Sequence, residues 1–216
     1  MYQTISITAL FITFACIAVH CIIFPSNKKR QWNPVKKLVH LFTLLFIEQK
    51  LSPVGVLRKL VYLLALLCFV VLAITGFYPT LVFGEHISGY PLMIHATFAP
   101  VFAICLAILA VMWASRCRFA CSDWPWFQRI VQRVTLVKNT GEDSQCESTG
   151  LVQKIMFWLI IFLALPLILS IVVSMFPIFG THWQELLLDI HRYTALVFAI
   201  VGIVHIYLVI RTKMKQ

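Results

Sequence analysis

Four histidines of this 216-residue chain lie inside long apolar stretches: His20, His95, His191 and His205. Polar side chains are costly within a membrane, so an intramembrane histidine is by default a candidate for function. A neutral imidazole can bind a metal, relay protons or hold a neighbouring helix through a hydrogen bond. A lone histidine would favour the last of these roles, and it is the spacing of the four that favours metal binding.

His191 and His205 lie 14 residues apart in one apolar stretch. In an α-helix this separation is about 21 Å along the axis and only about 40° away from the same face. One face of this helix would therefore present an imidazole near each side of a bilayer. Two stacked b-type haems, bound by neutral imidazoles on facing helices, need such an arrangement.

The composition requires that these stretches be membrane helices. Hydrophobic residues make up 61% of the chain and charged residues 12%, whereas soluble domains have about 45–50% and about 25%. A soluble enzyme, a disordered protein and a nucleic-acid-binding module are thereby excluded. The net charge of +10 comes from basic residues that lie between the apolar stretches, as in integral membrane proteins.

Five stretches are long enough to cross the hydrocarbon, which takes about 20 residues of helix. They cover residues 4–24, 61–83, 92–115, 155–178 and 187–210. They are too long and too uniformly apolar for barrel strands, so we predict an all-α integral membrane protein with a bundle of five transmembrane helices. Residues 4–24 are expected to remain as a helix rather than to be removed as a signal peptide. Residues 33–50 are expected to form an amphipathic helix along the membrane surface.

The basic residues predict the orientation of the bundle. Seventeen of the eighteen Lys and Arg residues fall between the first and second stretches, between the third and fourth, or after the fifth. Arg192 alone lies near the opposite side. Because basic connections stay in the cytoplasm, the N-terminus is predicted outside and the C-terminus inside a prokaryotic inner membrane.

With this topology, His95 and His191 lie at matching depths near the outer side and are predicted to clamp one haem iron. The inner partner of His205 is less evident. His20 lies at a similar depth and is favoured over His40, which shares a helical stripe with lysines. His20 also belongs to a stripe of small residues that indicates close packing, formed by Ser6, Ala9, Thr13 and Cys16.

A set of short motifs occurs in order along residues 58–207. The motifs are Leu72-Ala-Ile-Thr-Gly76, Ile94-His95, Asp123-Trp-Pro-Trp126, Gln153-Lys-Ile-Met-Phe-Trp158, Ile190-His191 and His205-Ile-Tyr207. In this order, and with the paired histidines of the last helix, the chain resembles the cytochrome b membrane (gamma) subunits of formate dehydrogenases, nickel–iron hydrogenases and thiosulfate reductases. The resemblance divides the chain into an extra N-terminal helix with the interfacial segment, residues 1–60, and a four-helix cytochrome b domain, residues 61–216.

The resemblance implies ligands for both haems. The outer haem would use His95 and His191, and the inner haem His205 together with a histidine near the start of the second helix. Here that neighbourhood, Arg58 to Tyr62, contains no histidine. Either His20 or His40 replaces the missing ligand, or the inner haem is absent.

The resemblance also implies further site residues. Similar proteins bind menaquinone near the inner haem at the start of the fourth helix, which suggests a quinone site here at Thr149, Gly150, Gln153 and Lys154. Arg192 adjoins His191 and would meet a haem propionate, or else pair with Asp189 or Glu185.

The sequence therefore predicts a haem b membrane subunit that transfers electrons between a periplasmic iron–sulfur or multihaem partner and the quinone pool. It would be a subunit of an oxidoreductase complex rather than an enzyme by itself. One alternative is a stand-alone transmembrane cytochrome b of the b561 type. Another is a transporter that uses the histidines for protons or metal ions, against which stands the lack of Asp and Glu deep within the five stretches.

Overall fold

The computed structural model describes residues 1–23, 53–115, 117–118, 148–176 and 180–215. Its elements are α1 (Tyr2–Ile23), α3 (Pro53–Tyr78), the π-helical turn η1 (Pro79–Phe83), α4 (Gly89–Ala114), α6 (Ser148–Ser174) and α7 (Thr181–Lys215). His40, the predicted interfacial segment 33–50 and the motif Asp123 to Trp126 lie outside the described residues.

Five of the helices are long and apolar enough to cross a membrane, which confirms the predicted all-α bundle. Several extend beyond the predicted stretches: α3 begins at Pro53, α6 at Ser148 and α7 at Thr181. Hydropathy marks the part of a helix that lies in hydrocarbon, whereas its hydrogen bonds continue into the polar interface. At the other end of α3, η1 closes at Gly84, whose positive φ of 72° suits glycine.

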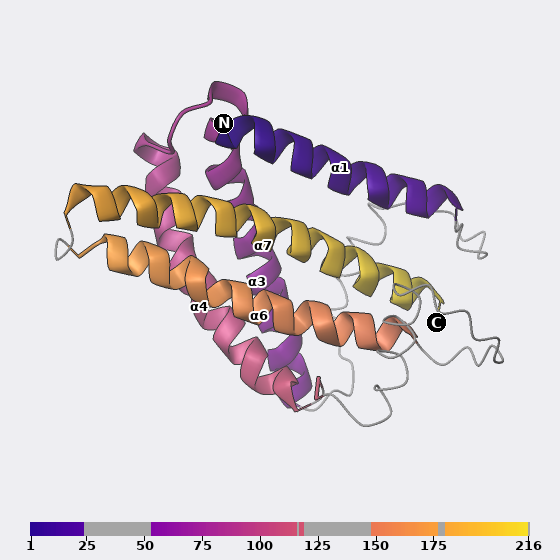
Figure 1. Ribbon diagram of the computed structural model, residues 1–216. Helices are drawn as coiled ribbons and strands as arrows, with labels where there is room; N and C mark the ends of the chain where they lie inside the picture. Colours follow the sequence, from indigo (N-terminus) through magenta and orange to yellow (C-terminus); the bar gives the residue numbers. More distant parts are fainter. Residues whose placement is uncertain (24–52, 116, 119–147, 177–179, 216) are drawn as a thin grey trace, which may run out of the picture.

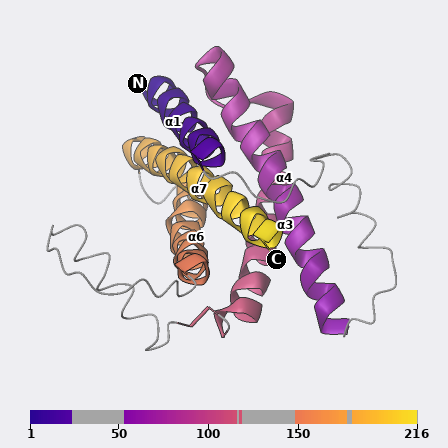
Figure 2. The same ribbon diagram turned by 90° about the vertical axis from the view of Figure 1, so that its right-hand side faces the viewer.

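The bundle consists of two helix pairs and one peripheral helix. Helix α3 packs closely on α4 and α6 on α7, whereas α4 and α6 approach each other at few points. Helix α1 contacts α7 and η1. Figures 1 and 2 show it beside α7, on the side of α7 away from α6.

The N- and C-termini lie at opposite ends of the bundle (Figure 1). We call the end that holds Tyr2 and the start of α7 the outer end, and the end that holds the C-terminus the inner end. At the outer end the Tyr2 hydroxyl donates to the carbonyl of Arg192 at 2.9 Å, and Gln3 Nε2 donates to the carbonyl of Leu81 at 3.1 Å. These two bonds fix the start of α1 to α7 and η1.

Three phenylalanines join the two helix pairs in the middle of the bundle. The rings of Phe69 on α3, Phe102 on α4 and Phe198 on α7 lie with their centroids 5.9 to 6.3 Å apart. Phe102 follows His95 by seven residues, and Phe198 lies seven residues from both His191 and His205. Phe69 precedes by seven residues Gly76, which contacts His95. The cluster therefore separates an outer site from an inner site about 10 Å to either side along the helix axes.

Candidate haem sites

The outer site is formed by His95 on α4 and His191 on α7, one from each helix pair. Both side chains are half-buried, and the two residues lie near each other. The structure thus brings together the two histidines that the sequence paired by depth.

A hydrogen bond fixes which nitrogen of His95 carries its proton. The Thr75 hydroxyl donates to the carbonyl of Val71 at 2.8 Å, and its oxygen lies 3.0 Å from Nδ1 of His95. Because the hydroxyl proton is already engaged, His95 Nδ1–H is the donor in the second bond. The lone pair of neutral His95 is then on Nε2.

His191 is held in the same tautomer by a different acceptor. Its Nδ1 lies 2.9 Å from the backbone carbonyl of Leu167 on α6, and a carbonyl oxygen only accepts. Metal-binding histidines commonly donate their second ring nitrogen in this way, which orients the ring and fixes the tautomer. In both outer imidazoles the lone pair that can bind a metal is therefore on Nε2.

Gly76 leaves the room that the His95 ring occupies. A Cβ added at Gly76 would lie 3.2 Å from Cε1 of His95 and 3.6 Å from Nδ1. The motif Thr75-Gly76 of the sequence thus supplies a hydrogen-bond acceptor and a gap, both against one imidazole.

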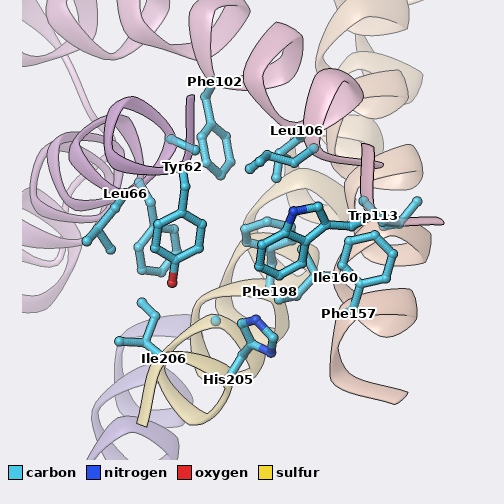
Figure 3. A pocket seen from close by; sticks show the side chains of 15 residues that line it. Tyr62, Leu66, Phe102, Leu106, Trp113, Phe157, Ile160, Phe198, His205 and Ile206 are labelled. Carbon is cyan, nitrogen blue, oxygen red and sulfur yellow. The ribbon is translucent and has the colours of Figure 1, made fainter. Parts of the chain in front are cut away.

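The inner site is a cavity of about 100 Å³ between the two helix pairs (Figure 3). This volume is smaller than the range of about 300–1,000 Å³ that is usual for ligand pockets, so a large ligand would need the lining side chains to move apart. All four helices α3, α4, α6 and α7 contribute side chains, most of them aliphatic or aromatic, and His205 lines the cavity from α7. His205 is buried, with 9% of its surface exposed, and its Nδ1 has no hydrogen-bond partner among the described residues.

The structure does not bring His20 to this cavity. His20 Nδ1 lies 2.6 Å from both the Tyr207 hydroxyl and an Arg211 guanidinium nitrogen. Tyr207 follows His205 by two residues, which places it about 200° around α7. His20 therefore lies against the opposite side of α7, and the predicted pairing of His20 with His205 has no support in this geometry.

The remaining predicted site residues lie as follows. The Arg192 guanidinium stands 4.5 Å above the Tyr2 ring and 3.5 Å from an Asp189 carboxylate oxygen, so the predicted alternative of an ion pair with Asp189 is present. Thr149, Gly150, Gln153 and Lys154 lie in the first turns of α6. Phe157, which lines the cavity, follows Lys154 by one helical turn.

Tyr62, which was not among the predicted site residues, lines the inner cavity together with His205. A signal was present in the sequence, since Tyr62 precedes Gly76 by 14 residues, the same separation as between His191 and His205.

The donors fit a b-type haem. Among the described residues, no group of three His, Cys, Asp or Glu side chains could hold a metal ion. Two imidazoles from separate helix pairs suit an iron whose other ligands come from a macrocycle. At the inner site, buried His205 has an Nδ1 atom without a hydrogen-bond partner among the described residues.

A bundle of membrane-spanning helices that brings together imidazoles from separate helix pairs is typical of a membrane cytochrome b. The family described as prokaryotic cytochrome b561 matches residues 59–216, and the chain belongs to this family. Members of the family bind b-type haem and transfer electrons in the membrane. The match leaves α1 outside, and among curated proteins none matches the chain.

Proposed function

We propose that this protein is a haem b anchor subunit that passes electrons between a redox partner outside the membrane and the quinone pool. The observation that carries this proposal is the outer pair, His95 and His191, whose Nδ1 atoms are engaged by Thr75 and Leu167. These bonds present two neutral imidazoles from separate helix pairs. A haem held between them supplies an iron that gains and loses one electron.

The inner cavity supports a second haem on His205. The residues around it are mostly aliphatic or aromatic, and the aromatic cluster of Phe69, Phe102 and Phe198 lies between the two sites. A site at each end of the bundle gives an electron path across the membrane.

The charge distribution supports the orientation in which the inner end faces the cytoplasm. With the five candidate spanning helices found among the described residues, the termini are expected on opposite sides. Seventeen of the eighteen basic residues fall in the connections and tail predicted for the inner side. In this orientation the outer site meets a periplasmic iron–sulfur or multihaem subunit. The inner site meets the quinone pool.

A quinone is proposed to bind near the start of α6, at Thr149, Gly150, Gln153 and Lys154. The support is their position in the turns that precede Phe157, a residue of the inner cavity. The polar groups there could bond to a quinone carbonyl at the membrane interface.

The purified protein in lipid vesicles provides the test. A pyridine haemochrome assay should give two b-type haems per chain, and a menaquinol analogue should reduce them. A protein that binds haem but exchanges no electrons with quinols would limit the proposal to the haem sites. A colourless protein after expression with ample haem would contradict it.

A further inference from the structure

The inner cavity differs from the outer site because His205 has no histidine opposite it among the described residues. Its second ligand therefore has to be sought among the other lining residues. The cavity is lined by fifteen residues, and most of them carry only hydrocarbon side chains. Besides His205, the polar side chains are Tyr62 and Trp113. The indole nitrogen of Trp113 is a hydrogen-bond donor without a lone pair for a metal. Among the lining residues, Tyr62 is therefore the remaining candidate for a second metal ligand.

The Tyr62 side chain is oriented toward this space. Figure 3 shows its ring reaching from α3 toward α7, with the hydroxyl on the same side as His205 and Ile206. The ring stacks on Trp113 with centroids 6.2 Å apart and planes 10° from parallel. The side chain is half-buried, and its hydroxyl makes no hydrogen bond with a described residue. The stack thus holds a phenol oxygen at the cavity with its hydrogen-bonding capacity unused.

Tyr62 also lies at the same depth in the bundle as His205. On α7 the inner residue His205 follows the outer residue His191 by 14 positions, and on α3 Tyr62 precedes Gly76 by 14. Each separation is about 21 Å along the axis with about 40° of rotation. Because Gly76 contacts the outer ligand His95, Tyr62 stands at the level of His205 on the facing helix pair.

We propose that the phenol oxygen of Tyr62 is the second axial ligand of the inner haem iron, opposite His205. This inference rests on the proposed function, in that it needs an inner haem. Tyrosine oxygen is a known axial ligand of haem iron. On binding ferric iron the O–H bond breaks, an O–Fe bond forms and the proton passes to water at the inner membrane face, with no change in oxidation state.

The test uses electron paramagnetic resonance and resonance Raman spectra of the oxidised full-length protein. The unmodified protein should show two different haems: a low-spin bis-imidazole centre at the outer site and a centre with phenolate vibrations at the inner site. Tyr62→Phe keeps the stack on Trp113 but removes the oxygen, so the phenolate vibrations should disappear and a high-spin signal replace them. The outer signal should stay unchanged.

Two further variants sharpen the result. Tyr62→His should restore two protein ligands and produce a second low-spin bis-imidazole signal. Tyr207→Phe removes a phenol at a similar depth on the opposite side of α7, where it contacts His20, and should match the unmodified protein.

Three outcomes overturn the proposal. Two bis-imidazole haems that survive Tyr62→Phe would place the second inner ligand elsewhere, with His40 the first residue to replace. A single bis-imidazole haem per chain would remove the inner haem while the outer site and the electron-transfer role remain. A protein without haem would overturn the proposed function itself.

Discussion

Thr75 on α3 and His95 on α4 are joined by a hydrogen bond of 3.0 Å in which the imidazole donates, because the threonine proton is committed to the carbonyl of Val71. A hydroxyl of this kind orients the ring and raises the basicity of the nitrogen that faces the metal. The α3–α4 pair thus orients one of the two proposed outer ligands, as the α6 carbonyl of Leu167 does for the other.

Thr75→Val should leave the protein in the membrane and the outer haem bound more weakly. Loss of a partner of this kind costs about 10–100-fold in metal affinity. Haem titration of the apoprotein measures the change, and Thr75→Ser is the control because it keeps the hydroxyl. Equal affinity in the valine variant would show that the bond does not orient the ligand.

Gly76→Leu should displace His95 and remove the outer haem alone. Even a Cβ at this position lies 3.2 Å from the ring, so a larger side chain pushes the imidazole away from the iron. The matched control is Gly180→Leu, since nothing lies within 4 Å of a Cβ there. Haem content per chain should fall by one in the first variant and not in the second; a fall in neither would mean that His95 needs no room at Gly76.

His20→Ala should leave both haem spectra unchanged. The side chain contacts Tyr207 and Arg211 on the side of α7 opposite to His205, so its loss affects the attachment of α1 rather than a ligand. Low-temperature optical spectra measure this. A change of one haem to high spin would instead establish His20 as the inner ligand, as its depth first suggested.

The orientation follows from charge, and fusions at the C-terminus test it. A reporter fused after Gln216 should be active when it is one that works in the cytoplasm, and silent when it is one that needs the periplasm. The reverse pattern would exchange the inner and outer ends and with them the side from which the partner delivers or takes electrons.

Much of this arrangement could be predicted from the sequence. Helix length and depth depend on the local run of apolar residues, so the five spans and the pairing of His95 with His191 were predictable. Which neighbouring helix a given face packs against depends on the arrangement of the whole bundle, and the local sequence does not specify it. His20 has the depth of His205 but belongs to the peripheral helix α1, which meets the other side of α7.

The position of Tyr62 in the cavity could not be predicted from the local sequence either. A tyrosine near the end of a membrane helix is common at the lipid interface, and only the packing of α3 against α4, with Trp113 beneath the ring, shows that it lines the cavity. The tautomers of His95 and His191 also depend on contacts between helices, with Thr75 and Leu167.

The most direct test of the account is the haem content of His95→Ala and of His191→Ala, measured by pyridine haemochrome on protein purified from membranes. Each variant should lose one haem per chain and its bis-imidazole signal, because one imidazole from each helix pair is needed to hold the outer iron. Haem content and signals unchanged in both variants would contradict the assignment of the outer site and the electron path that begins there.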